Sequence, residues 1–510
     1  MKRGWKLLLS ALALYLLLLV ALVAAEGRSP NGSIRTLWDA VWFSLITMTT
    51  VGYGDLSPVT PVGRVLGLIF AMCSIGILTA LIGIGLRLLG GQIIPSLRLR
   101  WGRRRRWYVF RDENEDAAAL GRALRREDPG CLLVFPEGEE HRLAGSDVIR
   151  LNASPEQLRR LRGGGTDGCV LFYLGADLWQ NYSRAFTASD TGFAVYCMTD
   201  VRADDLPANV HLFSRTEALG RSYWREHPLS KNEQCVALLG CGEAGSALLE
   251  RAILTNVLPD RTGVEYHVFD DSAHFAALHG EIVRAMAPDN IDEDRLIFHA
   301  EDWREALDVL ERADRIILCW DDDAENLAVS EAMRTWLSLP GEIHLRLHEP
   351  VPPLRSFGER ERVITPELVM KAALDRQAVL INDLYNRGSA SPVSWEAMGW
   401  FLRQSNIAAA DHLMVKIRYL LDDDSLTDFS PALCRRAWER LQAIRNDEAD
   451  TLQRAEHRRW MRFHWLYNWQ YASARDNARR LHPLLVPYDA LAPAERSKDM
   501  TPWEILGQLL

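Results

Sequence analysis

Cysteine is scarce in this sequence and basic residues are outnumbered by acidic ones, 59 to 68, and each feature argues against a class of protein. Eight cysteines are scattered over 510 residues, with no Cys-x-x-Cys pair and no metal-ligand spacing. This usage argues against a disulfide scaffold or a zinc site and fits a reducing compartment. The formal net charge is −9, so the composition gives no indication of nucleic-acid binding. No apolar segment carries arginine at every third position, which excludes a voltage sensor.

Long apolar runs are also few, and the two that exist lie within the first ninety residues. Residues 5–25 and 65–89 are each long enough to cross a hydrocarbon core of about 30 Å as a helix. Basic residues precede the first run and follow the second, whereas residues 26–60 contain few. The positive-inside rule therefore predicts a multi-pass membrane protein with both termini in the cytoplasm. A secretory signal peptide is the alternative for the first run, but its cleavage would leave the second run without a partner.

Between these runs, residues 36–49 are apolar but too short to cross, which predicts a re-entrant pore helix. Non-helical backbone persists at membrane depth only where it is buried in protein or lines water, so residues 50–54 are expected to line a pore. Gly52 and Gly54 allow positive φ, and alternating such residues points successive carbonyls to one side. Four copies around an axis would stack carbonyl rings that replace the hydration shell of K⁺. The expected K⁺ ligands are Thr50, Val51, Gly52 and Tyr53, and the filter ends at Gly54.

The sequence Thr-Val-Gly-Tyr-Gly-Asp at residues 50–55 resembles the selectivity-filter signature of potassium channels. The order of helix, pore helix, filter and helix is similar to that of two-transmembrane channels, which assemble as tetramers. The resemblance implies that Trp42 and Asp55 support the filter. Ile46 stands where some members have a glutamate, so inactivation is expected to differ. The candidate gate and hinge positions in the second span are Ser74, Gly76, Thr79 and Gly83.

From residue 107 onward, short apolar runs alternate with helical stretches, which predicts a mainly parallel sheet covered by helices. The alternation restarts near residue 229 and ends with a strand predicted at residues 363–365. The second unit carries Gly-Cys-Gly-Glu-Ala-Gly between a strand and a helix, the context of a dinucleotide fingerprint. A tight turn without ligand is the alternative. The candidate nucleotide-binding residues are Gly240, Gly242, Gly245 and Asp270.

Tandem Rossmann-like units behind a two-span pore resemble the conductance-regulating (RCK) domains of potassium channels. The resemblance implies a ring under the pore in which ligand binding pulls on the inner helices. The first unit lacks the fingerprint, so we expect it to be structural. Acidic runs at residues 321–323 and 422–424 could bind Ca²⁺, but we favour helix capping and solvated loops. No His, Lys or Ser with a paired acid indicates hydride transfer, so we expect no enzyme.

The last part of the chain is helical and rich in Trp, Arg and His. The order of its short motifs, including residues 455–460 and 482–488, resembles the ryanodine-receptor repeat (RyR) domain of bacterial proteins. Asn468 stands where that family shows a glycine. Arginines could bind phosphate and aromatic faces could stack on a base, although a small helical core with Trp anchors is the alternative. The candidate ligand-binding residues are Trp460, Trp469, Tyr471, Arg475, Asp476, His482 and Tyr488.

These patterns together predict an α-helical membrane pore followed by tandem α/β Rossmann-like domains and a small all-α domain. The expected boundaries are 1–92 for the pore, 93–106 for a basic linker, 107–228 and 229–390 for the Rossmann-like units, and 394–510 for the helical domain. We expect a homotetrameric potassium channel of a bacterial inner membrane, gated by a cytoplasmic small molecule. The candidate ligands are an adenine nucleotide, NAD(H) or a cyclic dinucleotide. The alternative is a membrane-anchored nucleotide sensor or enzyme with a vestigial pore.

Overall fold

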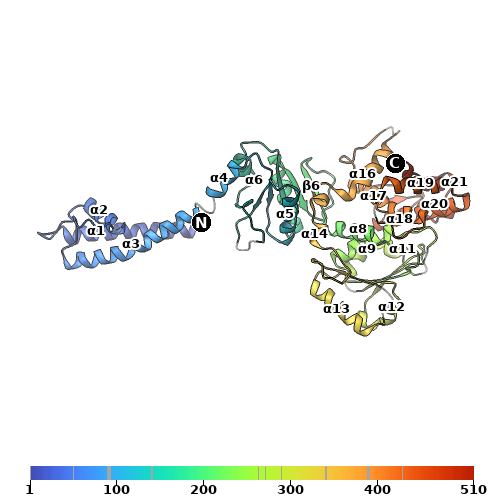
Figure 1. The fold of residues 1–510 in the computed structure, drawn as a ribbon, viewed down its shortest axis with the longest axis horizontal. Coiled ribbons are helices and arrows are strands. Elements are labelled where there is room, and N and C mark those ends of the chain that lie inside the picture. Colours follow the sequence, from blue (N-terminus) through green and yellow to red (C-terminus); the bar gives the residue numbers. More distant parts are fainter. Residues whose placement is uncertain are drawn as a thin grey trace. The chain divides into compact units, whose positions relative to one another are not determined.

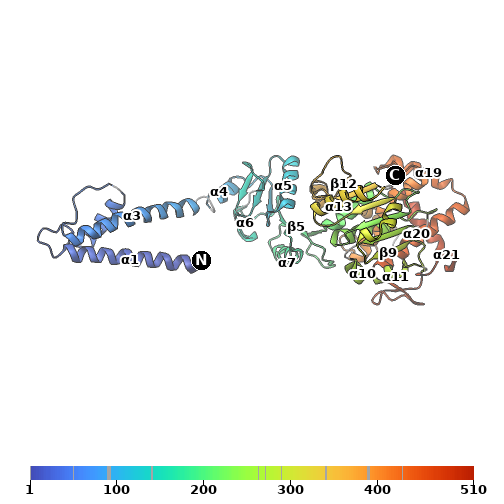
Figure 2. The same cartoon turned by 90° about the horizontal axis from the view of Figure 1, so that it is seen from below.

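The structure is a computed structural model that describes all but a few short segments of the chain. The residues outside the description are 1, 50, 89–92, 139–141, 262, 270–271, 289, 339–341, 388–390, 428 and 510. The chain divides into two units, shown from two directions in Figures 1 and 2. The first comprises residues 1–102 with 150–152, and the second comprises residues 103–149 and 153–510.

The described residues of the first unit form two long helices and two short ones. Helices α1 (Lys2–Glu26) and α3 (Pro61–Leu88) lie side by side, and α2 (Leu37–Met48) contacts both (Figures 1 and 2). Helix α4 (Ile94–Trp101) follows. The buried residues that hold the three contacting helices together are Leu19, Leu22, Ile34, Ala40, Phe43 and Phe70. Among the residues that the structure describes, no helix combines sufficient length with the sustained hydropathy needed to span a membrane.

Helix α2 falls within the segment predicted as the pore helix, and its first turn shows why it starts there. The Thr36 hydroxyl accepts a hydrogen bond from the Asp39 amide at 3.1 Å, and the Asp39 carboxylate accepts one from the Thr36 amide at 2.8 Å. This reciprocal pair is a capping box, which satisfies two backbone donors at the helix N-terminus. The helix start is therefore determined locally by the sequence Thr-x-x-Asp.

The second unit begins with a six-stranded sheet in the order β3-β2-β1-β4-β5-β6, which is the Rossmann order. Strand β1 is buried throughout, as expected for a parallel sheet covered on both faces. Its strands are β1 (Trp107–Phe110), β2 (Leu132–Phe135), β3 (Val148–Arg150), β4 (Cys169–Tyr173), β5 (Ala194–Met198) and β6 (Val210–Phe213). Its helices are α5 (Glu115–Glu127), α6 (Pro155–Leu161), α7 (Leu178–Ala188), η2 (Ser189–Thr191) and α8 (Arg215–Glu226).

A second parallel sheet follows in the order β12-β11-β10-β7-β8-β9, so the chain repeats the same topology. The prediction of two Rossmann-like sheets is thereby confirmed. Its strands are β7 (Cys235–Leu239), β8 (Glu265–Phe269), β9 (Arg295–His299), β10 (Arg315–Leu318), β11 (Glu342–Arg346) and β12 (Ser356–Phe357). Its helices are α9 (Glu243–Thr255), α10 (Ala273–Leu278), α11 (Gly280–Ala285), η3 (Trp303–Glu305), α12 (Leu307–Arg312) and α13 (Asp323–Trp336).

The strand predicted at residues 363–365 is wrong. Residues Arg360–Val363 form helix α14, and Thr365 caps helix α15 (Pro366–Val369) by accepting a hydrogen bond from the Leu368 amide at 3.2 Å. Proline at the first helical position fits such a start. Val363 and Ile364 are fully buried by tertiary packing, and a short apolar run does not distinguish a strand from a buried helix end.

The remaining residues form a helical part around a separate apolar cluster that includes Ile407, Ile417, Leu441 and Trp503. Its longer helices are α16 (Arg376–Asn386), α17 (Trp400–Asp411), α18 (Leu413–Leu421), α19 (Pro431–Gln442) and α20 (Asn446–Leu466). Its short elements are η4 (Ala373–Asp375), β13 (Gln470–Tyr471), β14 (Leu481–His482), η5 (Tyr488–Ala490), α21 (Pro493–Arg496), η6 (Ser497–Met500), α22 (Thr501–Glu504) and η7 (Ile505–Gly507).

Helices α8 and α9 join the two sheets, because they lie side by side at close range (Figure 1). An added Cβ at Gly220 of α8 would lie 2.8 Å from the Ala247 carbonyl oxygen of α9, so only glycine allows this approach. The indole of Trp224 donates a hydrogen bond to the Leu248 carbonyl at 2.8 Å. The last helix of the first α/β unit is thus packed against the first helix of the second.

Candidate functional site

The loop after α2 adopts the backbone that its glycines allow. Gly52 has φ of +54° and Gly54 has φ of +77°, in agreement with the expectation of positive φ at both. An added Cβ at either position would meet nothing within 4 Å, so the backbone conformation rather than space requires glycine. The amides of Val51 and Gly52 donate to the Ile46 carbonyl at 3.0 and 3.2 Å, which ties the loop to the end of α2. Thr50 lies outside the described residues.

Trp42 connects the helix to this loop through both parts of its side chain. Its indole NH donates a hydrogen bond to the Asp55 carboxylate at 3.0 Å. Its ring stacks on Tyr53 with 6.4 Å between ring centroids and 9° between the planes. Together these contacts hold the middle and the end of the loop at a fixed distance from α2. This geometry is consistent with the support role that the sequence resemblance implied for Trp42 and Asp55.

The gate candidates Ser74, Gly76, Thr79 and Gly83 all lie in α3, which is helical from Pro61 to Leu88. Thr79 and Gly83 are exposed in the single chain, and a Cβ added at Gly83 would meet nothing within 4 Å. The four positions therefore lie along one uninterrupted helix.

Sequence reasoning missed Glu26, the last residue of α1, which is fully buried. Its carboxylate accepts hydrogen bonds from the Val59 amide at 3.0 Å and from the Thr60 amide and hydroxyl at 2.9 and 2.7 Å. An added Cβ at Gly63 would lie 1.9 Å from the Glu26 carboxylate, so glycine makes room for it. Glu26 thus fixes the start of α3 beside the end of α1. The available signal was an acid at the end of an apolar run, together with the proline that begins α3.

The turn of residues 240–245 contains three glycines, and each has a different structural role. Gly240 has φ of +86°, and an added Cβ would lie 2.7 Å from the Trp320 amide nitrogen. At Gly245 an added Cβ would lie 2.0 Å from the Gly240 carbonyl oxygen, so helix α9 depends on glycine to pack against the turn. At Gly242 the nearest atom would be 3.8 Å away. Packing therefore requires glycine at two positions and leaves the third open for approach to the helix N-terminus.

The N-terminal amides of α9 favour an anion at this turn, although an Asp321 carboxylate oxygen would lie 3.8 Å from a Cβ added at Gly242. Gly242 is the N-cap residue of α9, and no described side chain caps that helix. The equivalent helix of the first α/β unit, α5, is capped instead by Asn114. Its side-chain oxygen accepts a hydrogen bond from the Ala117 amide at 2.8 Å. Uncapped N-terminal amides and the helix dipole attract negative charge. Of these two equivalent helices, α9 is thus the one without a side-chain cap among the described residues, and Asp270 lies outside them.

The acidic run at residues 321–323 lies beside the turn, and each of its carboxylates has a partner. Asp321 binds Arg346 at 2.6 Å, Asp322 caps α13, and Asp323 binds His348 at 2.7 Å. Burial lowers the pKa of His348, although Asp323 opposes the shift. In the second acidic run, Asp422 has positive φ at the end of α18 and pairs with Lys231, and Asp423 closes a turn onto the Ser425 amide at 3.0 Å. These contacts match capping and loop roles.

The seven aromatic and polar candidates of the C-terminal part do not converge. Trp460 and His482 line a cavity of about 440 Å³. The other five lie elsewhere: Trp469 is buried against Phe401, Tyr471 is exposed, Arg475 donates to Asn477, Asp476 binds the Arg479 amide, and Tyr488 donates to Asp450 and Gln453. The ring of Tyr488 is further covered by two guanidinium groups, of Arg454 and Arg496. Of the seven candidates, Trp460 and His482 thus line this cavity.

The cavity contains buried charges that sequence reasoning did not assign. Glu456 pairs with Arg459 at 2.6 Å and with Lys416 at 2.8 Å. Burial would raise the pKa of Glu456, but Arg459 and Lys416 outweigh it and lower that pKa to about 2. Burial lowers the pKa of Lys416 to about 8, although Glu456 opposes this shift. The signal was present in the sequence Glu-His-Arg-Arg-Trp of residues 456–460, where charged residues recur on one helix.

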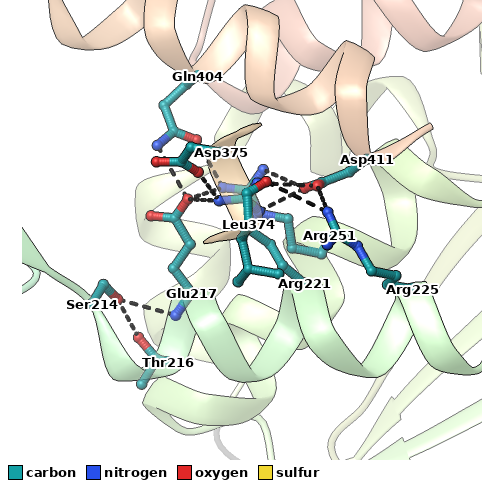
Figure 3. A network of polar contacts seen from close by, with 10 residues as sticks. All are labelled: Ser214, Thr216, Glu217, Arg221, Arg225, Arg251, Leu374, Asp375, Gln404 and Asp411. Atoms are coloured by element: carbon teal, nitrogen blue, oxygen red, sulfur yellow. Dashed lines mark hydrogen bonds and ion pairs between the residues drawn. The ribbon is translucent and has the colours of Figure 1, made fainter. Parts of the chain in front are cut away.

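A second buried network joins the α/β units to the helical part (Figure 3). The guanidinium of Arg221 on α8 binds both carboxylate oxygens of Asp411 on α17, at 2.8 and 3.1 Å, and Asp375 of η4 at 2.5 Å. Arg251 on α9 binds Glu217 at 2.8 Å and Gln404 at 2.7 Å. Burial would lower the pKa of Arg221, but Asp411 and Asp375 raise that pKa, so the Arg221 guanidinium stays charged. Four elements are thereby connected through charges inside the protein.

Comparison with known proteins identifies the first part of the chain. Residues 7–90 match the family described as "Ion channel". A voltage-gated potassium channel of Aeropyrum pernix is 46% identical over 63 residues, which are 12% of this chain and 21% of that protein. The potassium voltage-gated channel protein shk-1 of Caenorhabditis elegans is 51% identical over 55 residues, 11% of this chain and 10% of that protein.

The chain thus spans about a fifth or less of the length of these relatives. Among solved structures, the GsuK channel is similar with a TM-score of 0.37 at 13% identity, over 75% of this chain and 86% of that one. Residues 7–90 thus match an ion-channel family, and 63 residues of the chain are similar in sequence to a potassium channel.

Proposed function

We propose that the chain forms a homotetrameric, potassium-selective membrane channel that is gated by a cytoplasmic small molecule. The observation that carries the proposal is the match of residues 7–90 to ion channels, combined with positive φ at Gly52 and Gly54 inside the filter-like sequence. The alternation of such residues with Val51 and Tyr53 suits a row of carbonyl oxygens that replaces the hydration shell of K⁺. The C-terminal end of α2 would add a favourable dipole for the cation.

A tetramer accounts for the exposure of the pore loop in the single chain. The side chains of Val51 and Tyr53 are 51% and 70% exposed, and Trp42 is 39% exposed. Non-helical backbone in a membrane must be buried in protein or line water. Four loops around one axis would meet both conditions, because side chains would pack between subunits while carbonyls line the pore.

For the gating ligand we propose a nucleotide whose phosphate binds the turn at Gly240–Gly245. The support is geometric: glycine at 242 leaves space at an uncapped helix N-terminus. A bound nucleotide would shift the equilibrium between two channel states only as far as its affinities for those two states differ. The chain between α3 and β1 is the covalent path by which a movement of the α/β units would reach the pore. We propose no enzymatic role for this site.

Thallium flux into liposomes that contain the purified protein tests both parts of the proposal. We expect selective flux that Gly52→Ala abolishes, because alanine disfavours φ of +54°. Gly165→Ala is the control, because Gly165 lies outside the pore, has no positive φ, and its added Cβ would meet nothing within 4 Å. Potassium selectivity that survives Gly52→Ala would refute the filter assignment.

The ligand is tested by adding ATP, ADP, NAD, NADH and cyclic dinucleotides to the cytoplasmic face. We expect one of them to change the flux and Gly242→Asp to remove that response, because a carboxylate would occupy the anion position. A flux that is indifferent to all of these compounds would retain the pore and refute the nucleotide assignment.

A further inference from the structure

The C-terminal helical part contains a cavity that is separate from the glycine turn. Its volume is about 440 Å³, within the range of about 300–1,000 Å³ that small-molecule sites occupy. Helices α16, α17 and α20 supply one part of its wall, and residues 482–502 supply the rest. Three properties of the wall restrict what it can hold.

The first property is an unsatisfied donor. Arg459 is 4% exposed, and its Nε and Nη2 atoms both donate to one oxygen of Glu456, at 2.9 and 2.6 Å. The remaining Nη1 atom is buried and has no hydrogen-bond partner in the described part of the chain. A buried donor without a partner is costly, so a ligand atom that accepts a hydrogen bond here would remove that cost.

The second property is an unsatisfied acceptor. The Oδ2 atom of Asp499 is buried and lacks a directed hydrogen bond among the described residues. Its neighbour is Nδ1 of His457, at 3.4 Å, while Nε2 of the same ring already binds the Val486 carbonyl at 2.9 Å. The Nε2 hydrogen of His457 is thus donated to that carbonyl and not to Asp499. In the cavity wall, Nη1 of Arg459 and Oδ2 of Asp499 thus lack hydrogen bonds from the described residues, as does Oε2 of Glu456, which lies 2.8 Å from the Lys416 ammonium.

The third property is an aromatic surface. Trp460 is half-buried in the wall and stacks on His457 with 5.7 Å between centroids and 18° between planes. His482 meets Trp460 edge-on, at 4.9 Å and 71°. Burial lowers the pKa of His482, which keeps its ring neutral. Such a surface suits a flat, uncharged ring.

Charge argues against a site for several phosphates. Three acidic and two basic side chains line the cavity: Glu456, Glu495 and Asp499 against Arg459 and Lys498. Lys498 is already paired with Glu495 at 2.7 Å, and Arg459 with Glu456. No surplus of positive charge remains among these groups to neutralise a polyanion.

We propose that this cavity binds the purine base of a nucleoside or nucleotide, with Arg459 and Asp499 on the donor and acceptor edge of the base and Trp460 on its face. A purine carries hydrogen-bond donors and acceptors on one edge, and its large flat ring system stacks well on an indole. The inference adds a binding site to the proposed gating by a small molecule. Only the effect of this site on gating rests on the proposed function. Binding itself does not depend on conduction.

Equilibrium binding of radiolabelled adenosine, guanosine and cytidine to the full-length protein in lipid nanodiscs tests the inference, with inorganic phosphate as a competitor. We expect one purine nucleoside to bind, cytidine to bind about tenfold more weakly or not at all, and phosphate not to compete. Trp460→Leu and Arg459→Lys should each weaken purine binding about tenfold or more. Lysine keeps the charge beside Glu456 but removes the forked donor. Asp499→Asn provides a third variant if Arg459→Lys fails to fold by gel filtration.

Tyr471→Ala is the matched control, because Tyr471 is 59% exposed and is not part of the cavity wall. We expect it, and Gly242→Asp in the distant turn, to leave purine-nucleoside binding unchanged. Three results would overturn the inference: no binding of either purine nucleoside to the folded protein, equal binding after the folded cavity substitutions, or loss of binding in Gly242→Asp. A protein that binds purines but conducts no thallium would overturn the channel proposal and leave this inference standing.

Discussion

Asp411→Ala should loosen the helical part of the protein from helix α8. The carboxylate of Asp411 is the principal partner of Arg221, whose side chain is only 4% exposed. Removing one member of a buried ion pair costs about 3–5 kcal/mol, because the other charge remains buried. Arg221 keeps Asp375 at 2.5 Å and the Leu374 carbonyl at 2.7 Å, so the lower end of that range applies. We therefore expect a loss of about 3 kcal/mol.

Native-state hydrogen exchange of the full-length protein measures this loss where it occurs. The free energy of opening should fall by about 3 kcal/mol for the amides of α17. Asp422→Ala is the control: it removes a surface pair with Lys231 in which the carboxylate side chain is 85% exposed, and such pairs contribute about 0–1 kcal/mol. Combining Asp411→Leu with Arg221→Met should recover part of the loss, since Arg221 is then no longer a buried charge. If Asp411→Ala lowers the opening free energy no more than Asp422→Ala, the network does not hold α17.

Three further outcomes are expected. Trp42→Phe should keep the ring over Tyr53 but remove the 3.0 Å hydrogen bond to Asp55, and single-channel recording should show shorter openings; unchanged open times would contradict the support role. Gly245→Ala should lower thermal stability, because its Cβ would lie 2.0 Å from a carbonyl oxygen, whereas Gly242→Ala should not, and equal melting temperatures would contradict the packing argument. Burial lowers the pKa of His464 to about 3, so the unfolded chain binds more protons than the folded chain below a pH of about 6.5. Stability should then fall as the pH falls from about 6.5, and His464→Phe should flatten the decline in melting temperature between about pH 7 and pH 5; an unchanged slope would contradict the assignment.

Local patterns predicted much of the fold, because each feature depended on neighbouring residues. The capping box of Thr36 and Asp39, the positive φ of Gly52 and Gly54, and the repeated strand and helix alternation are all encoded within short windows. The wrong strand at residues 363–365 shows the limit of this approach. Apolar residues there are buried by distant elements, and the decisive local signal was Thr365 followed by Pro366 at a helix start.

Long-range contacts explain most of what sequence reasoning missed at the sites. Arg221 and Asp411 are 190 positions apart, and no periodicity indicates that they meet. In the C-terminal part, aromatic and polar residue types suggested seven ligand-binding positions, but aromatic rings also fill cores. Trp469 packs on Phe401 and Tyr488 bonds to Asp450 and Gln453, so only tertiary structure separates them from Trp460.

Helix α20 gives the proposed cavity a physical connection to the second α/β unit. Glu456, Arg459 and Trp460 line the cavity, whereas Arg462 of the same helix binds Asp292 at 2.5 Å and Asp294 at 2.7 Å, in the segment before β9. Arg462 is fully buried, so moving the helix away from these carboxylates would uncover an unpaired charge at a cost of several kcal/mol. A ligand that moves α20 must therefore move the second α/β unit with it. Coupling between two binding sites is reciprocal. If a purine in the cavity changes the nucleotide affinity of the glycine turn by some factor, the nucleotide must change the purine affinity of the cavity by the same factor.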